Sequence, residues 1–181
     1  MVHAVTRWYP IQTTFCRFVP WRLRCADLSN SPANQTEGLI KSVGVIFDGN
    51  LTLDIENVIH QLIKHGIEEN QIKVLIFKNN INKNEVYNHE VFTYKEINLS
   101  GEITNPKAEL FLKTKFDLLI NYHEFDKMPL VYSSYLSNAN FKVGFTSKDK
   151  IVNQFMINTS LENYQLFLDE LFKYLKILNK I

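Results

Sequence analysis

Cysteine is absent from the chain after residue 25, and this absence excludes two kinds of site. The two cysteines, Cys16 and Cys25, both lie near the beginning of the 181-residue sequence. Residues 39–181 can therefore form neither a disulfide scaffold nor a zinc site made of cysteine ligands. We expect an ordinary hydrophobic core in this region, which is long enough for a single domain.

Long apolar runs and an excess of charge of one sign are also absent. No run approaches the ~18 apolar residues that a membrane-spanning helix needs, so we expect no membrane partner. The chain has 20 Lys and Arg and 19 Asp and Glu; four Arg and two acids precede residue 39, which leaves 16 basic and 17 acidic residues. This nearly neutral body has no basic field for phosphates, so nucleic-acid binding is not expected.

Glycine is scarce, with six residues in the chain, and no glycine-rich phosphate-binding motif is present. The patterns Gly-x-Gly-x-x-Gly and Gly-x-x-x-x-Gly-Lys-Ser/Thr are both missing, so we expect no nucleotide cofactor and assign none. The Gly-x-Ser-x-Gly pattern of serine hydrolases is missing as well, and Ser133 and Ser134 lie inside a predicted helix. These absences exclude the common sequence signatures of catalysis and leave open whether the protein is an enzyme.

The first 25 residues differ in composition from everything that follows. They contain every Arg and both Trp of the chain but no Lys, Asp or Glu. Three interpretations stay open: an organelle-targeting peptide, a segment foreign to the body, and a native arm that docks on the body. The polar stretch "DLSNSPANQTEG" then indicates a linker. We predict a dispensable segment over 1–38 and one domain over 39–181.

Short apolar, β-branched runs in the body predict buried strands that alternate with amphipathic segments. The first two runs are separated by one helix-length segment, which indicates parallel strands joined by a right-handed crossover. The last two are separated only by "TSKDK", which is short enough for a C-terminal β-hairpin. The predicted strands, about five in number, cover 41–47, 72–77, 116–122, 141–145 and 151–157, with "VFTY" as a further possibility.

Helical spacing and capping residues predict the helices between these strands. A first helix follows Thr52 as possible N-cap and ends at Gly66, and a short one begins at Asn105-Pro106. "MPLVYSSYL" supplies another. The C-terminal helix follows Ser160 and carries an apolar stripe at i, i+3 and i+4 spacing. Its members are Tyr164, Phe167, Leu168, Leu171, Leu175 and Leu178. These elements predict a three-layer α/β domain with a mostly parallel sheet and helices on both faces.

Several segments resemble a family of short uncharacterised proteins from Bacteroidetes-type bacteria. The segments "VGVIFDGN", "FLKTKFDLLINYHE", "NANFKVGF", "NQFMINT" and "ELFKYLKILNKI" carry this resemblance, which covers about residues 40–181. The family is a domain of unknown function. The resemblance implies an α/β fold and a cytoplasmic bacterial protein, but it brings no catalytic residue. Residues 1–38 do not resemble the beginning of the family.

The candidate site lies where predicted strands end. In open α/β sheets, ligands bind beyond the carboxyl ends of the strands, so polar residues at three such ends should share one rim. Asp48, His123 and Glu124 have the chemistry of an acid/base or metal-binding cluster, although polar residues at strand ends are also ordinary surface features. The complete set of candidate ligand-binding residues is Asp48, Asn50, Tyr122, His123, Glu124 and Thr146.

Two hypotheses for function follow from the body. The first is a non-catalytic domain that binds a partner protein or a small molecule, since no catalytic constellation is present. The second is an enzyme of transferase type that uses Asp48, His123 and Glu124 at the strand ends. The sequence alone names neither a substrate nor a reaction.

Overall fold

A computed structural model describes residues 38–51, 54–82, 85–98, 101–124, 127–146 and 152–181. Its centre is a six-stranded sheet in which every pair of neighbours is parallel. The predicted segment 1–38 lies outside the described residues except for Gly38. The strands are β1 (Val43–Asp48), β2 (Ile72–Phe77), β3 (Glu90–Phe92), β4 (Leu118–Tyr122), β5 (Phe141–Phe145) and β6 (Phe155–Ile157).

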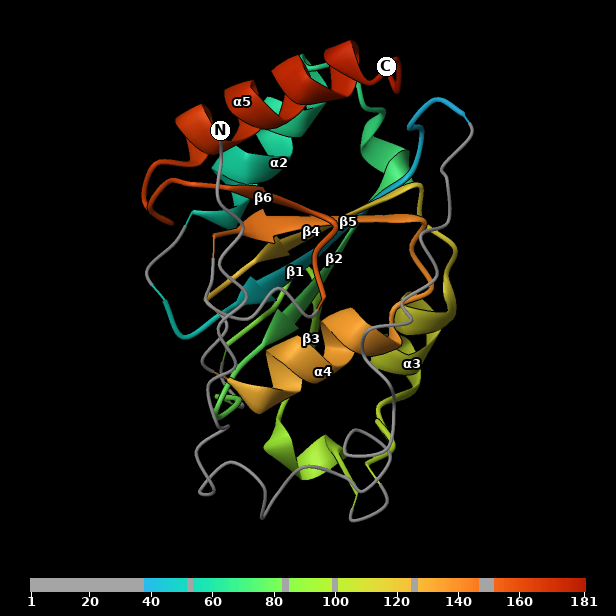
Figure 1. Cartoon of the computed structure of the whole chain (residues 1–181). Helices are drawn as coiled ribbons and strands as arrows, with labels where there is room; N and C mark the ends of the chain where they lie inside the picture. The colour runs from blue at the N-terminus through green and yellow to red at the C-terminus, as the bar shows by residue number, and fades with distance from the viewer. Residues whose placement is uncertain (1–37, 52–53, 83–84, 99–100, 125–126, 147–151) are drawn as a thin grey trace, which may run out of the picture.

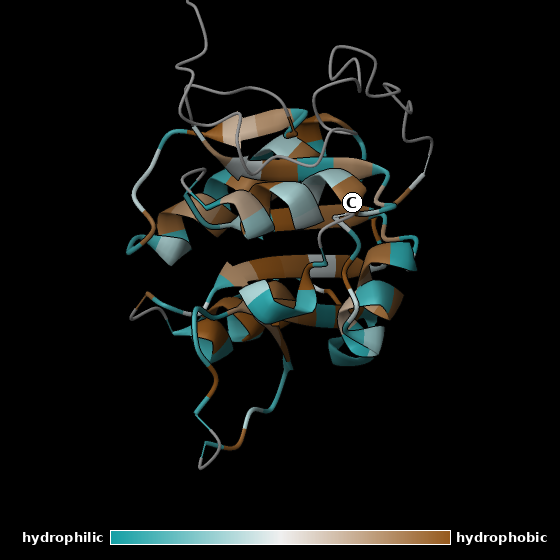
Figure 2. Ribbon diagram, turned by 90° about the horizontal axis from the view of Figure 1, so that it is seen from below, coloured by the Kyte–Doolittle hydropathy of each residue, from teal (hydrophilic) through white to brown (hydrophobic). Residues whose placement is uncertain are grey.

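Four α-helices cover the two faces of this sheet and make three layers (Figure 1). Hydrophobic strands lie between helices that carry hydrophilic residues, as Figure 2 shows. One face packs against α2 (Ile55–Lys64) and α5 (Tyr164–Ile177), and the other packs against α3 (Pro106–Lys113) and α4 (Met128–Leu136). Two short 3₁₀ turns, η3 (Glu69–Gln71) and η4 (Tyr94–Glu96), complete the described elements. The predicted three-layer α/β fold is confirmed.

Side-chain caps define where α2, α3 and α5 begin. Asn105 caps α3 as predicted, because its side chain accepts hydrogen bonds from two N–H groups of the first turn. Asp54 caps α2 and Asn163 caps α5 in the same manner. The predicted cap Thr52 lies outside the described residues. Ser160 was the wrong residue, since it lies three positions before the cap.

The predicted C-terminal hairpin is wrong, because β5 and β6 pair in parallel. Neighbouring parallel strands require the chain to return to the same end of the sheet before the second strand begins. The predicted strand over 151–157 was too long: β6 begins only at Phe155, so nine residues, 146–154, join the two strands. That length exceeds a hairpin turn and allows the return.

The C-terminal stripe buries α5 against the sheet. Phe167, Leu168, Leu171 and Leu175 of the predicted stripe have no measurable exposure, whereas Leu178 is 48% exposed. Full burial of four such side chains contributes roughly 1.5–3 kcal/mol each. The C-terminal helix is therefore an integral part of the core, as the periodicity predicted.

The strand order is β3-β2-β1-β4-β5-β6, so the chain builds outward from β1 first in one direction and then in the other. Connections on the two sides of β1 and β4 consequently leave toward opposite faces, and in open α/β sheets a crevice forms outside the carboxyl ends of two such strands. The prediction that β1 and β4 end on one rim is confirmed by their parallel register, which places Phe47 opposite Tyr122. In sheets of this type, ligands bind at this crevice.

Candidate functional site

Asp48 and Asn50 form the end of β1 at this crevice. The Asp48 side chain is only 2% exposed, and its Oδ1 accepts hydrogen bonds from Asn50 N at 3.0 Å and Asn50 Nδ2 at 2.7 Å. Asn50 Oδ1 in turn accepts from Asn79 N at 2.9 Å, which joins the turns after β1 and β2. Glycine is required at position 49, between Asp48 and Asn50, because a Cβ there would collide with Ile76 of β2 and with Lys78 directly after it. The "DGN" turn is thus shaped by close packing as well as by its polar bonds.

Lys127 completes the environment of Asp48 from the other side of the crevice. Its Nζ donates to Asp48 Oδ2 in an ion pair, and 22% of its side chain is exposed. Burial acts to raise the pKa of Asp48, but hydrogen bonds from Lys127 and Asn50 outweigh it and hold the pKa below its ordinary value. Asp48 therefore stays ionised at neutral pH, and it cannot act there as a general acid.

His123 lies directly after β4 and points to the same face as Asp48, toward α4. It is fully buried; its Nδ1 lies 2.9 Å from the carbonyl oxygen of Glu124, and its Nε2 lies 3.2 Å from Ser134 Oγ. A carbonyl oxygen can only accept a hydrogen bond, so the ring proton of His123 is on Nδ1. His123 is thereby held in one orientation between the loop after β4 and the last turn of α4.

A buried polar cluster extends from His123 across the sheet. Ser134 Oγ lies 2.7 Å from Asn121 Oδ1, and the Asn121 amide donates to Asn153 Oδ1 at 2.6 Å. Gly144 of β5 leaves room for Asn153, because a Cβ at this position would collide with the Asn153 amide. All members except Gly144 are polar side chains with at most 8% exposure. We call Asn121, His123, Ser134 and Asn153 the buried polar cluster.

Tyr122 lies away from the candidate site, although it is the residue before His123. Successive side chains of a strand point to opposite faces, and Tyr122 packs on the α5 side, 4.8 Å from the Phe47 ring. Its hydroxyl donates to the carbonyl oxygen of Leu161 at 2.5 Å, and burial raises its pKa. Tyr122 is a buried core residue with a satisfied hydroxyl.

Glu124 and Thr146 reach the rim from β4 and β5. Both are exposed, and the Thr146 N–H donates to the carbonyl oxygen of Ile157 at 3.0 Å. The structure therefore brings Asp48 and Asn50 into direct contact and places His123 on the same face, while Glu124 contributes its carbonyl oxygen to His123. Thr146 bonds through its backbone N–H to β6 rather than to the pair at β1.

Sequence reasoning missed Lys127 and Ser134. Lys127 precedes Met128-Pro129, and a proline in the first turn indicates where α4 begins. This signal places a cation at the amino end of a helix that borders the crevice. Ser134 faces the sheet because it follows Leu130 by four residues, one turn of the helix.

A metal centre is not supported by the described part of the chain. Within it, no three or more His, Cys, Asp or Glu side chains are grouped so that they could hold an ion. Asp48, His123 and Glu124 would have to converge for the metal-binding interpretation, but the Asp48 carboxylate is engaged by Lys127 and the His123 ring by Ser134. The described helices also include none that is long and apolar enough to cross a membrane.

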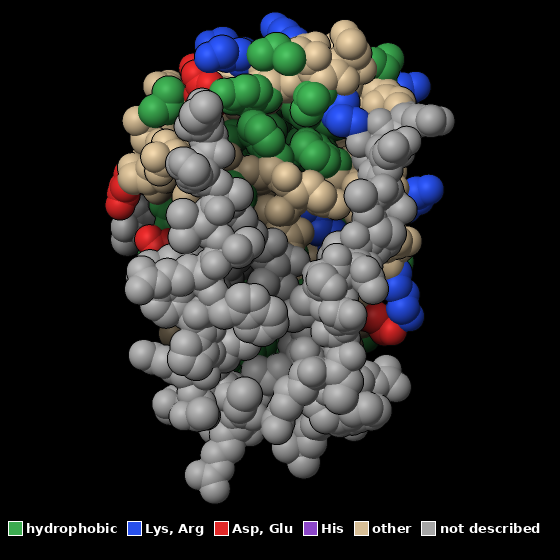
Figure 3. All heavy atoms as spheres, viewed as in Figure 1, with side chains coloured by type: hydrophobic (Ala, Val, Ile, Leu, Met, Phe, Trp, Pro, Cys, Tyr) green, Lys and Arg blue, Asp and Glu red, His purple; other side chains and the backbone are tan. Residues whose placement is uncertain are grey.

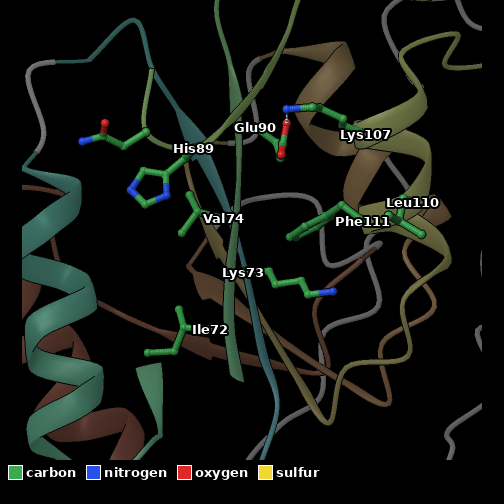
Figure 4. A pocket seen from close by; sticks show the side chains of 9 residues that line it. Ile72, Lys73, Val74, His89, Glu90, Lys107, Leu110 and Phe111 are labelled. Atoms are coloured by element: carbon green, nitrogen blue, oxygen red, sulfur yellow. Dashed lines mark ion pairs between the residues drawn. The ribbon is translucent and has the colours of Figure 1, made fainter. Parts of the chain in front are cut away.

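An open depression of about 330 Å³ lies elsewhere, at the amino-terminal half of β2. Two of its lining side chains are already paired with charged partners, since Glu90 contacts Lys107 at 3.0 Å (Figure 4) and His89 contacts Glu56 at 3.1 Å. It also lies toward the end of the sheet opposite to the rim. Its lining residues are Ile72, Lys73, Val74, Asn88, His89, Glu90, Lys107, Leu110 and Phe111.

Comparison with known proteins identifies the family of the chain but assigns no function to any residue of the candidate site. A model described as a family of unknown function (DUF6913) matches residues 23–178. No curated protein and no solved structure matches the chain. The match confirms the resemblance to a domain of unknown function. It begins at residue 23, ahead of the boundary predicted at residue 39, so residues 23–38 belong to the matched region although the sequence analysis placed them outside the resemblance.

Proposed function

We propose that this chain, which belongs to the family of unknown function named above, binds a small polar ligand in the crevice between the carboxyl ends of β1 and β4. The observation that carries the proposal is the strand order, which reverses between these two strands. Open parallel sheets bind their ligands at this position, because the loops on its two sides diverge toward opposite faces.

Charged and amide groups from both strand ends support this position. Asp48 and Asn50 follow β1, and Lys127 approaches from the loop after β4. A ligand with an acidic group can compete for the partly exposed Lys127, while a hydroxyl or amine of the same ligand can donate to Asp48 or Asn50. Glu124 and Thr146 are exposed on the same rim and supply further hydrogen-bonding groups.

A dinucleotide is the wrong ligand class for this crevice. Such a ligand places its pyrophosphate at the amino end of the helix after β1. In this chain Asp54 caps α2, and Glu56 lies in the first turn. Two carboxylates therefore stand where an anion would bind, and they repel it.

A catalytic function is the second proposal. His123 Nε2 lies 3.2 Å from Ser134 Oγ, a separation found between a general base and the nucleophile that it activates. Both side chains are fully buried, so a substrate cannot reach either of them without a movement of α4. Non-catalytic binding is for this reason the function that the geometry supports better. The resemblance supports a cytoplasmic bacterial setting.

The test is ligand binding to the full chain, followed by NMR. Sugar phosphates, nucleotides, amino acids and divalent metals serve as probes, and binding should shift the amide signals of Asn50, Glu124 and Thr146. Lys127→Met should weaken binding at least about tenfold, which corresponds to about 1.4 kcal/mol. Lys107→Met is the matched control, since Lys107 is also ion-paired but lies at the depression beside β2.

Two results contradict the proposal. One is a ligand whose signals map to the depression beside β2 and whose affinity falls in Lys107→Met. The other is the absence of any shift with all four classes of probe, which favours a partner protein over a small molecule. A ligand that shifts the His123 ring signals and is also consumed would support the catalytic proposal instead.

A further inference from the structure

The open depression beside β2 lies where the sheet is one strand short. β3 begins at Glu90, which pairs with Leu75, so residues 72–74 of β2 have a neighbouring strand only on the β1 side. All three of these residues line the depression of about 330 Å³. Among the described residues the depression is therefore an uncovered stretch of sheet edge, and an unpaired edge is a template for a further strand.

Two backbone groups of β2 point out of the sheet at this edge. The N–H of Lys78, directly after the strand, donates to the Phe92 carbonyl oxygen of β3 at 3.0 Å. Backbone groups of every second residue point to the same side, so those of Ile72 and Val74 also point toward the β3 side. The Ile72 N–H is engaged by the carbonyl oxygen of Glu69. This leaves the Ile72 C=O and the Val74 N–H, which have no backbone partner in the described part of the chain.

The side chains at the edge are apolar on one face of the sheet and include a cation on the other. Ile72 and Val74 belong to the core on the α2 side. Lys73 points the opposite way, to the side of Phe111 (Figure 4). Lys73 is exposed and makes no ion pair with the described residues, whereas Glu90, the acidic residue that lines the depression, is already paired. The depression therefore has a cation available for a partner.

These features together specify an extended peptide with an acidic residue. A peptide strand beside residues 72–74 can donate to the Ile72 C=O and accept from the Val74 N–H, as in strand addition. Residues directly opposite each other in a sheet point to the same face, so a carboxylate opposite Lys73 meets its ammonium group. The two neighbours of this acid point to the apolar α2 side. Leu110, which lines the depression and is 65% exposed, offers an apolar contact on the α3 side.

We infer that the depression beside β2 docks an extended segment of a partner protein, with an acidic residue between two apolar residues, as an added strand. Apolar side chains also gather below α5 in Figure 3, but an apolar surface alone does not specify its occupant. The depression combines backbone groups, apolar side chains and a cation at one place. This inference is independent of the ligand proposed at the β1–β4 crevice, which lies at the opposite ends of the strands.

The test is an NMR titration of the full chain with the blocked peptide Thr-Leu-Val-Glu-Val-Leu-Thr. The Val74 amide signal should shift on binding. In the free chain this amide should exchange hydrogen faster than that of Leu75, and saturation with the peptide should slow it at least about tenfold. Lys73→Glu should weaken binding at least about fivefold, because repulsion replaces attraction. Lys95→Glu is the matched control, since Lys95 is exposed in η4, beyond the other end of β3.

A peptide with Lys in place of Glu makes the test independent of any change in folding. It should bind Lys73→Glu more tightly than it binds the unsubstituted chain, a rescue that requires contact at this position. Lys127→Met should leave the affinity for both peptides unchanged. Failure of the crevice proposal and failure of this inference are thereby distinguishable.

Three results overturn the inference. The first is that the Glu peptide does not bind, or shifts signals on another surface. The second is a free chain whose Val74 amide already resists exchange as strongly as that of Leu75, because another part of the chain then covers the edge. The third is binding that shifts the signals of Lys73 and Leu110 without slowing exchange at Val74, because the occupant is then not an added strand.

Discussion

The two faces of the sheet differ most at the carboxyl ends of the central strands. On the α5 face, Phe47, Tyr122, Phe145 and Phe167 form a continuous aromatic cluster, in which successive rings lie 4.4–5.0 Å apart and the Tyr122–Phe145 contact is edge-to-face. On the α4 face, at the same level of the sheet, the buried polar cluster and Asp48 take the place of these rings. One face thus has the content of a hydrophobic core, whereas the other resembles the wall of a binding site.

This difference shows where the fold concentrates its stability and where it tolerates a cost. Aromatic packing stabilises the folded state without the need for hydrogen-bond partners. Buried polar groups stabilise only while each of them has a partner, and they are costly when a partner is lost. Natural proteins accept this cost at functional positions. The α4 face is therefore where substitutions should separate stability from function.

The largest effect is expected on the α5 face. Leu171 is fully buried on the side of α5 that faces the sheet. Leu171→Ala should therefore lower the free energy of unfolding by ~2–5 kcal/mol through lost burial and an unfilled cavity. Leu166→Ala is the control in the same helix, since Leu166 is 44% exposed. Urea denaturation of both variants measures the difference. A near-neutral Leu171→Ala would place the stripe of α5 outside the core.

A smaller effect is expected from the buried polar cluster. Ser134→Ala removes the hydroxyl that lies 2.7 Å from Asn121 Oδ1 and 3.2 Å from His123 Nε2, and it should cost about 1–3 kcal/mol. Ser133→Ala is a close control, because Ser133 Oγ is buried in the same helix without a hydrogen-bond partner among the described residues. Its removal should be neutral or slightly stabilising. Equal effects in the two variants would mean that the cluster is not cooperative.

The pH dependence of stability offers a third comparison, through Lys142 of β5, whose ammonium group lies at the carboxyl end of α4. Its Nζ donates to the carbonyl oxygen of Ser134 at 2.8 Å, and burial lowers its pKa to about 8. Between this pKa and the ordinary value of 10.5, the unfolded chain binds more protons here than the folded chain does. This residue's contribution to the free energy of unfolding therefore rises with pH across that window and is constant below it.

In Lys142→Met this rise should vanish, a difference of about 1–2 kcal/mol between pH 8 and 10 once partial solvent screening is allowed for. Urea denaturation at several pH values measures it, and groups that titrate in both proteins cancel in the difference. Lys113→Met, at the exposed end of α3, is the control and should leave the slope of the full chain unchanged. Parallel pH profiles for the full chain and Lys142→Met would contradict the assignment.

The smallest effect is expected from the segment before the domain. A chain that begins at Gly38 should keep the melting temperature of the full chain within ~5 °C, which is roughly 1 kcal/mol for a domain of this size. A chain that begins at residue 23, where the family match begins, separates the two parts of the segment. A larger loss between 23 and 38 than before 23 would move the domain boundary toward the start of the match.

Local patterns in the sequence were sufficient for the element types and for most of their positions. The apolar run at 72–77 coincides with β2, and Asn105-Pro106 begins α3 as predicted. These features depend on nearest neighbours along the chain, such as capping atoms and side-chain periodicity. The C-terminal hairpin failed for the opposite reason, because the direction of β6 depends on where the chain returns relative to β5.

The candidate site was determined in part by the sequence and in part by tertiary structure. The rule for parallel strands was enough to bring Asp48 and Asn50 to the rim with the end of β4. Tertiary structure alone decided the strand order, the pairing of Lys127 with Asp48 and the contact of Ser134 with His123. Each of these features joins segments that are distant along the chain. Because side chains alternate along β4, Tyr122 packs on the α5 side of the sheet and the next residue, His123, lies on the α4 side. Sequence periodicity specifies that two faces exist, and only packing against helices specifies which face carries the polar groups.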